Sequence, residues 1–188
     1  MIIKEKGLFR AMKEAYRGGG YKVLVCPVDD ERWIFIYNGF WVAAMEMRNV
    51  PRKILGLIAE HIGTIPTMED AYKVRKDDVQ KELFEMAEKP IRHILARRME
   101  INRLPVVKRT KLLLDGIEVW QQVDNLQIVR FNPDYSQIAE IDADDSKLTG
   151  DMLLRVGEIS LAGIMGIQIG EAERHVIEHL SQMQWVEG

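Results

Sequence analysis

The first fifty residues show one helical pattern followed by three strand patterns. Leu8, Met12 and Ala15 recur three or four residues apart, which places them on one face of a helix over residues 8–16. Glycines at positions 18–20 are expected to end this helix. Strands are predicted over residues 21–27, 32–37 and 40–47, where apolar and aromatic residues dominate.

Two turns should connect these three strands. Asp29-Asp30 separates the first two strands, and Asn38-Gly39 separates the second from the third. Asn-Gly is typical of a type I′ hairpin, because this turn needs a positive φ at both central positions. The pattern therefore predicts a three-stranded antiparallel meander with a tight turn at Asn38-Gly39.

The middle of the chain carries helical signals. A helix is predicted from Pro51, because proline suits the first helical turn. Thr67-Met68-Glu69-Asp70 has the spacing of a capping box and predicts a long helix to about residue 88. Pro90 should interrupt the helical pattern, because proline lacks the amide hydrogen that a helix interior requires. A second helical stretch is expected to run on to about residue 101.

A second strand group and a helical region are predicted for the rest of the chain. Strands are expected over residues 106–114, 117–123 and 126–131, with turns at Asp115-Gly116 and Asp124-Asn125 and a fourth strand at 135–141. Residues 149–186 are expected to be helical, with interruptions near Gly157 and Gly170.

Strands that segregate from helices in this way predict an α+β protein rather than a doubly wound parallel sheet. The expected fold has two antiparallel meanders separated by helices, with a helical C-terminal region. Residues 1–66 would hold the first helix, the first meander and the second helix. Residues 67–104 would form a helical connector, and residues 105–188 would form the second strand group and the C-terminal helices. A chain of 188 residues with 47% hydrophobic residues can bury a core, so we expect one compact unit.

Composition narrows the cellular setting and the chemistry. The single cysteine, Cys26, cannot form an intrachain disulfide, and its apolar surroundings indicate a buried thiol. The N-terminus becomes charged at once and has no signal-peptide pattern, which indicates a cytoplasmic protein. Residues 152–170 are largely apolar, but Arg155 and Glu158 argue against a membrane span.

One short motif suggests a metal site. His175, Glu178 and His179 spell H-x-x-E-H, a pattern in which two imidazoles on one helix face bind zinc while the glutamate activates water. A catalytic zinc needs a third protein ligand, for which the candidates are Glu171, Glu173 and His61. We expect no metal ion and no other cofactor, and we keep a small metal-dependent hydrolase as the alternative function.

Residues 140–145 form an acidic run that resembles part of a calcium-binding loop. An EF-hand loop that starts at Asp142 needs glycine at its sixth position and glutamate at its twelfth, and finds Lys147 and Leu153. The run is therefore expected to be a solvated loop.

Charge is unevenly distributed along the chain. From Lys89 to Lys111, eight cations minus one acid give +7, whereas over residues 133–188 eleven acids minus three cations give −8. A basic segment of this kind can bind the phosphates of a nucleic acid or an acidic protein. Its expected binding residues are Arg97, Arg98, Lys108, Arg109 and Lys111. The alternative is that the segment pairs with the acidic C-terminal region, within the chain or across a dimer.

Aromatic residues gather around the Asn38-Gly39 turn. Trp33, Phe35 and Tyr37 alternate onto one face of a strand, and core packing is the expected role of such a stripe. The alternative is a binding surface, which would be a dimer contact or a stacking platform for bases.

Self-association is expected from two features. Two short strand groups leave unpaired edges, and four small residues in the predicted C-terminal helix would let another helix or strand approach closely. These residues are Ala162, Gly163, Gly166 and Gly170. We expect a homo-oligomer, most simply a dimer. A monomer mass by light scattering at high micromolar concentration would contradict this.

The sequence therefore predicts a non-enzymatic binding or assembly module with no catalytic residues. A net charge of −3 excludes the strongly basic composition of a general polyanion binder but leaves room for a local basic surface. The expected partners are a second copy of the chain and a nucleic acid or acidic protein, and no membrane.

Overall fold

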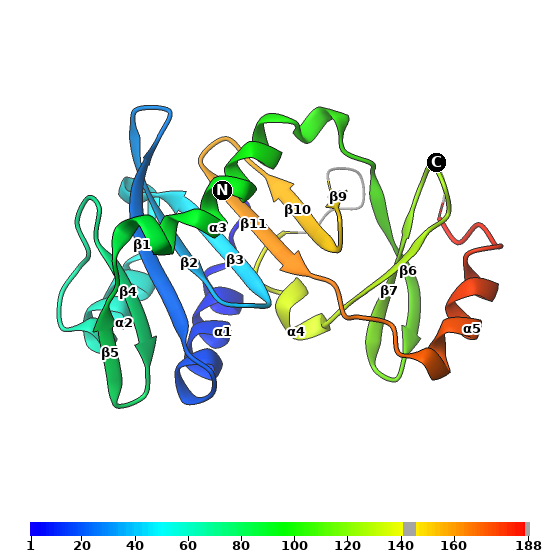
Figure 1. Cartoon of the computed structure of the whole chain (residues 1–188), viewed down its shortest axis with the longest axis horizontal. Coiled ribbons are helices and arrows are strands. Elements are labelled where there is room, and N and C mark those ends of the chain that lie inside the picture. The colour runs from blue at the N-terminus through cyan, green and yellow to red at the C-terminus, as the bar shows by residue number, and fades with distance from the viewer. Residues whose placement is uncertain (141–145, 187–188) are drawn as a thin grey trace.

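A computed structural model describes residues 1–140 and 146–186 (Figure 1). Its strands form two antiparallel sheets, one of eight strands and one of three, and helices pack beside them. The chain is an α+β protein, as the segregated strand patterns predicted.

The elements follow one another along the chain as two sheets and five α-helices within the described residues. The large sheet contains β1 (Tyr21–Val28), β2 (Glu31–Tyr37), β3 (Trp41–Glu46), β4 (Ala71–Arg75), β5 (Asp78–Lys81), β9 (Lys147–Thr149), β10 (Met152–Val156) and β11 (Ser160–Met165). Its strands lie side by side in the order β5-β4-β1-β2-β3-β11-β10-β9. The small sheet has the order β6-β7-β8 and contains β6 (Val107–Leu114), β7 (Ile117–Gln122) and β8 (Ile128–Phe131). The helices are α1 (Glu5–Arg17), α2 (Arg52–Ile62), α3 (Phe84–Met99), α4 (Pro133–Ser136) and α5 (Glu171–Leu180), with 3₁₀ turns at Met47–Asn49 and Ile101–Arg103.

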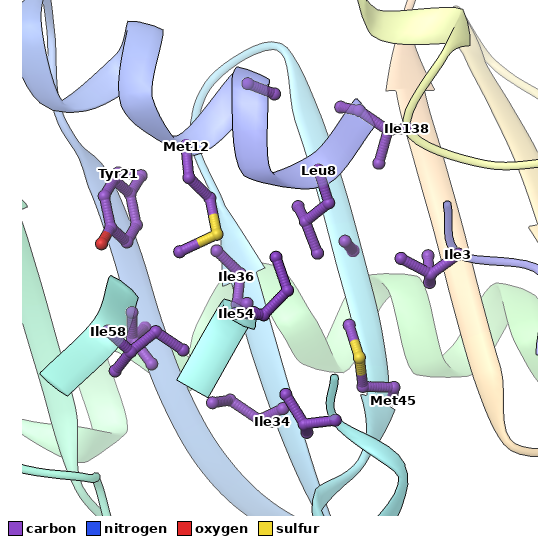
Figure 2. Packing of buried hydrophobic residues seen from close by; sticks show 14 of the residues in the cluster. Ile3, Leu8, Met12, Tyr21, Ile34, Ile36, Met45, Ile54, Ile58 and Ile138 are labelled. Carbon is purple, nitrogen blue, oxygen red and sulfur yellow. The ribbon is translucent and has the colours of Figure 1, made fainter. Parts of the chain in front are cut away.

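Helices cover both faces of the large sheet at its centre. On β1, Val23 packs in a cluster with α1 and α2, whereas Leu24 packs with α3 on the opposite face. Figure 2 shows Leu8 and Met12 of α1 above Ile36 of β2. A strand that is covered on both faces has a nearly continuous apolar sequence, which explains why β1 and β2 could be recognised as strands.

The small sheet packs against the far end of the large one. Trp120 and Phe131 meet edge to face, with ring centroids 5.9 Å apart, and both pack with Leu153 and Ile164 of the large sheet. On the other face of the small sheet, Ile177 of α5 packs against β7 and β8. The C-terminal helix therefore belongs to the small sheet (Figure 1).

The long helix predicted for residues 67–88 is wrong, because this stretch begins with a turn and a hairpin. Asp70 accepts hydrogen bonds from the backbone and hydroxyl of Thr67, each 2.8 Å long, much as in a capping box. Glu69, however, has a φ of 63°, which no α-helix allows. Ala71 then pairs with β1, so β4 and β5 extend the large sheet.

Helix α3 runs through Pro90, where a break was predicted. The helix is continuous from Phe84 to Met99. Proline removes one intrahelical hydrogen bond, the one to the residue four positions earlier. That residue, Met86, is 70% exposed, so this part of the helix borders solvent and the missing bond costs less than it would in a core.

The helix predicted for residues 149–170 is also wrong, because the stretch supplies β9, β10 and β11. Strand β11 lies between β3 and β10, and residues 160–164 are all buried. Such a continuous apolar run cannot be distinguished from a buried helix by its periodicity alone. Residues 171–180 do form the expected helix, α5. Within residues 1–140 and 146–186, no helix is long and apolar enough to cross a membrane.

The small residues of this stretch pack strands rather than helices. A side chain at Gly163 would meet Val42 at 2.8 Å and Met152 at 2.9 Å, so the missing side chain lets neighbouring strands pack closely. Self-association remains a prediction, but it now depends on the sheet edges alone. At one edge, all four residues of β5 are exposed.

The fourth strand predicted at residues 135–141 is replaced by α4. Asn132 caps this short helix by accepting a 2.9 Å hydrogen bond from the backbone of Asp134. Pro133 suits the first helical turn. Most of the acidic run, residues 141–145, lies outside the described residues.

Candidate functional site

A hollow of about 600 Å³ lies at one end of the large sheet, where β1 begins and β2 ends. It is bordered by the last turns of α1, by the glycine turn at residues 18–20 and by the β2–β3 turn at residues 38–41. Single residues of α3, α4 and β4 complete its wall. We call this hollow the pocket.

The glycine turn gives the pocket an open rim. The amide of Gly18 donates to the carbonyls of Glu14 and Ala15, each at 3.1 Å, and the amide of Gly20 donates to Ala15 at 2.7 Å. Gly20 has a φ of +90°, and a Cβ there would lie 2.7 Å from the carbonyl oxygen of Val74, so glycine is required at this position. The chain thus turns directly from α1 into β1 without placing a side chain over the pocket.

The β2–β3 turn forms the opposite rim, and it is not the type I′ turn that Asn38-Gly39 predicted. Neither residue has a positive φ. Strand β2 ends at Tyr37 and β3 begins at Trp41, so three residues connect the strands instead of two, and Tyr37 pairs with Val42. The Asn38 side chain holds the loop, because its Oδ1 accepts hydrogen bonds from the amides of Phe40 at 2.8 Å and Trp41 at 3.1 Å.

Five of the residues that line the pocket are aromatic. Phe40 is 60% exposed and stacks on Tyr135 of α4, with centroids 6.0 Å apart and an interplanar angle of 15°. Tyr37 and Tyr21 are buried, and their hydroxyls bond elsewhere, to the Ala87 carbonyl at 2.7 Å and to His61 Nδ1 at 2.8 Å. Burial raises the pKa of both tyrosines well above the usual value, so both phenols stay neutral.

Trp41 lines the pocket but is itself part of the core. The residue is 2% exposed, and its indole Nε1 is buried without a hydrogen-bond partner among the described residues. A buried donor without a partner costs about 1–3 kcal/mol. Because neighbouring protein atoms cover Nε1, this donor makes no polar contribution to the pocket.

Two lysines supply positive charge at the pocket. Lys22 of β1 and Lys73 of β4 lie directly opposite each other across the two strands. The Nζ atom of Lys22 contacts Glu82 at 2.8 Å, whereas Lys73 has no ion-pair or hydrogen-bond partner within the described parts of the chain. Glu14, the acidic residue that lines the pocket, forms a salt bridge with Arg10 at 2.8 Å.

The basic segment does not form one uniform cationic surface. Arg98 is held by Asp29 at 2.6 Å, and its guanidinium lies 5.3 Å from the Trp33 ring. Arg97 pairs with Glu100 at 2.9 Å, and Arg109 pairs with the buried Glu118. Lys108 and Lys111 lie on β6, where the register shifts between Arg109 and Leu113. Arg97, Arg98 and Arg109 thus pair with acids that lie outside the C-terminal region 133–188.

The H-x-x-E-H motif lies on α5, where His175, Glu178 and His179 are exposed. Of the candidate third ligands, Glu173 is held by Arg130 at 2.7 and 2.8 Å, and His61 lies on α2 beside Tyr21. No group of three or more His, Cys, Asp or Glu residues in the described ranges 1–140 and 146–186 is arranged to hold a metal ion. The geometry gives the metal alternative no support.

The aromatic stripe predicted on β2 is core. Trp33, Phe35 and Tyr37 all pack in the cluster that faces α3. The sequence predicts aromatic residues around the β2–β3 turn, but it gives no sign that Tyr135 stacks on Phe40 or that Lys73 lies opposite Lys22. The position of Lys73 was hidden by the helix wrongly predicted over β4.

Comparison with protein families, with curated proteins and with solved structures finds no match for this chain. The function has to be argued from the chemistry of the pocket and of the basic segment.

Proposed function

We propose that this chain is a non-enzymatic binding protein and that it holds a small, ring-containing ligand in the pocket. The observation that carries the proposal is a hollow of about 600 Å³ walled by Tyr21, Tyr37, Phe40, Trp41 and Tyr135. Small-molecule sites typically enclose about 300–1,000 Å³ and combine apolar and aromatic walls with a few polar groups. A nucleophilic role for the cysteine is disfavoured, because Cys26 is 1% exposed and burial raises its pKa to about 12.

The proposal is tested with N-phenyl-1-naphthylamine, a neutral dye that becomes fluorescent in apolar sites. Stacking on one aromatic side chain is worth about 1–3 kcal/mol, so Phe40→Ala should weaken dye binding roughly fivefold or more. Phe40 is 60% exposed, so this change should leave the fold intact.

Leu113→Ala is the matched control, because Leu113 is equally exposed, at 61%, but lies on the small sheet away from the pocket. The control should bind the dye as the wild type does. The proposal fails if the wild type does not bind the dye, or if the two variants behave alike.

A second candidate function is anion binding through the basic segment. It is favoured by the exposure of Lys89, Arg92, Arg97, Arg103, Arg109 and Lys111 along α3, the following turn and β6. Internal acids neutralise part of this charge, so the expected partner is a polyanion that competes with them, such as a nucleic acid.

The second candidate is tested by titrating single- and double-stranded DNA at two salt concentrations. Binding should weaken log-linearly with salt, and each lost phosphate contact should reduce the slope by about 0.9 on double strands. Arg97→Ala/Lys111→Ala should flatten the slope without disturbing Arg98, which is bound to Asp29. An unchanged slope would place any DNA site elsewhere, and no binding at low salt would exclude this function.

A further inference from the structure

We propose that the ligand of the pocket is an aromatic anion, a planar ring system with an acidic group that binds beside Lys22 and Lys73. This inference rests on the proposed function and narrows it to one class of ligand. It follows from two features of the pocket, the positive charge of its lysines and the exposed ring of Phe40.

Strand register brings two positive charges together at the pocket. Lys22 and Lys73 are direct cross-strand partners on β1 and β4, and like charges in this position repel each other. Glu82 neutralises Lys22 at 2.8 Å. On its other side Lys73 faces Gln80 of β5, which is neutral. One positive charge therefore remains uncompensated at the pocket, and an anionic group of a ligand would neutralise it.

Nearby acids do not cancel this charge. Glu14, the acid of the pocket lining, already pairs with Arg10 at 2.8 Å, and Arg10 also contacts Asp134 at 3.2 Å. Asp70, the acid nearest β4 in sequence, pairs with Lys81 at 2.7 Å. The local field at the pocket is thus positive, because these carboxylates are already matched by cations.

Phe40 and Tyr135 form a stacked pair of rings at the pocket. Phe40 is exposed at the mouth of the pocket and is held beside Tyr135 by the turn that Asn38 organises. An exposed ring with fixed orientation offers a face on which a second ring can stack. A planar ligand would cover this face, and its acidic group would then lie near the lysines.

The ring and the charge together describe the ligand. The exposed ring of Phe40 favours a planar group, and the charge of Lys73 favours an anion. A ligand with both properties is an aromatic acid or a ring-bearing phosphate.

The test compares two dyes that share one ring system. The neutral dye is N-phenyl-1-naphthylamine, and the anionic dye is 8-anilinonaphthalene-1-sulfonate. Wild-type protein should bind the anionic dye more tightly at low salt, and salt should reduce this preference because it screens charge. Lys73→Met should weaken the anionic dye about fivefold and the neutral dye hardly at all. Lys73→Arg keeps the charge and should restore the preference.

The outcomes separate the two proposals. If the neutral dye binds through Phe40 but the anionic dye gains nothing from Lys73, the anion inference is wrong and the proposed function stands. If neither dye depends on Phe40, both are wrong.

Competition then identifies the anionic group. 1-Naphthoate and 1-naphthyl phosphate carry different anions on the same ring, and preferential displacement by either one supports the inference and indicates a carboxylate or a phosphate. Equal displacement by the neutral 1-naphthalenemethanol would overturn it.

Discussion

Replacing Gly7 with alanine should lower the free energy of unfolding by about 3 kcal/mol, although it adds a single methyl group. A Cβ at Gly7 would lie 2.0 Å from the carbonyl oxygen of Gln137 and 2.6 Å from its carbonyl carbon. These are backbone atoms, so no side-chain rotation can relieve the clash. Helix α1 would have to move away from the segment after α4.

That segment is fixed from the other side as well. Lys4 donates a 2.8 Å hydrogen bond to the Ile138 carbonyl, and Glu140 donates a 2.7 Å bond to the Ile2 carbonyl. Ile3 and Ala139 form a bridge between these two stretches. The clash therefore strains a paired backbone, which is why the expected loss is at the upper end of the usual range for overpacking.

Gly56→Ala in α2 is the matched control. A Cβ at Gly56 meets nothing within 4 Å, and alanine is favoured over glycine inside a helix by about 1 kcal/mol. The control should thus be slightly more stable than the wild type. Urea unfolding followed by tryptophan fluorescence measures both changes. A Gly7→Ala protein as stable as the wild type would contradict the packing of α1.

Because α1 contributes Ala11 and Ala15 to the pocket, Gly7→Ala should also weaken binding of the neutral dye.

Two hairpin turns could be predicted from the dipeptides that form them. Asp29-Asp30 and Asp115-Gly116 were expected as turns, and in both pairs both residues have positive φ. Each is a two-residue connection between paired strands. The need for a positive φ at both positions therefore specifies the turn, and Asp and Gly meet that need.

At Asn38-Gly39 the local sequence preference does not decide the turn. The dipeptide permits a type I′ turn, but the buried residues on either side fix the register at Tyr37 and Val42. Core packing therefore decides the loop length. The Asn38 amide donates to the Trp41 carbonyl at 3.0 Å, and its side chain binds the amides of Phe40 and Trp41. Tertiary packing overrode the local preference.

The pocket could not have been predicted from one sequence, for a similar reason. Its lysines come from strands separated by α2, and Tyr135 comes from a helix predicted as a strand. Only the pairing of β1 with β4 brings Lys22 and Lys73 together. The aromatic residues of the β2–β3 turn could be recognised because they are neighbours in sequence. The pair of positive charges at Lys22 and Lys73 could not, because it depends on the register of β1 against β4.

Acid should loosen α5 before it unfolds the rest of the chain. Arg130 of β8 is 3% exposed, and its guanidinium donates to both carboxylate oxygens of Glu173, at 2.7 and 2.8 Å. This hydrogen bond lowers the pKa of Glu173, and the Gly170 amide and the charge of Arg130 act in the same direction. The folded pKa is thus below the unfolded value of about 4.3. The pair therefore stabilises the fold above that pH, and the contribution is lost as the pH falls through the folded pKa.

Glu173→Gln should reproduce this loosening at neutral pH, because it leaves the buried guanidinium without its counter-charge. Trp185 reports the change. Its amide donates to Gln121 at 2.8 Å, and its indole donates to the Leu180 carbonyl at the end of α5 at 2.9 Å. We expect a red-shifted Trp185 fluorescence and a melting temperature several degrees lower, with little further change on acidification.

Glu178→Gln is the control, because Glu178 is an exposed carboxylate on the same helix. This variant should behave as the wild type. If Glu173→Gln retains the acid transition of the wild type, the Arg130 pair is not its cause, and the packing of Ile177 and Leu180 holds α5.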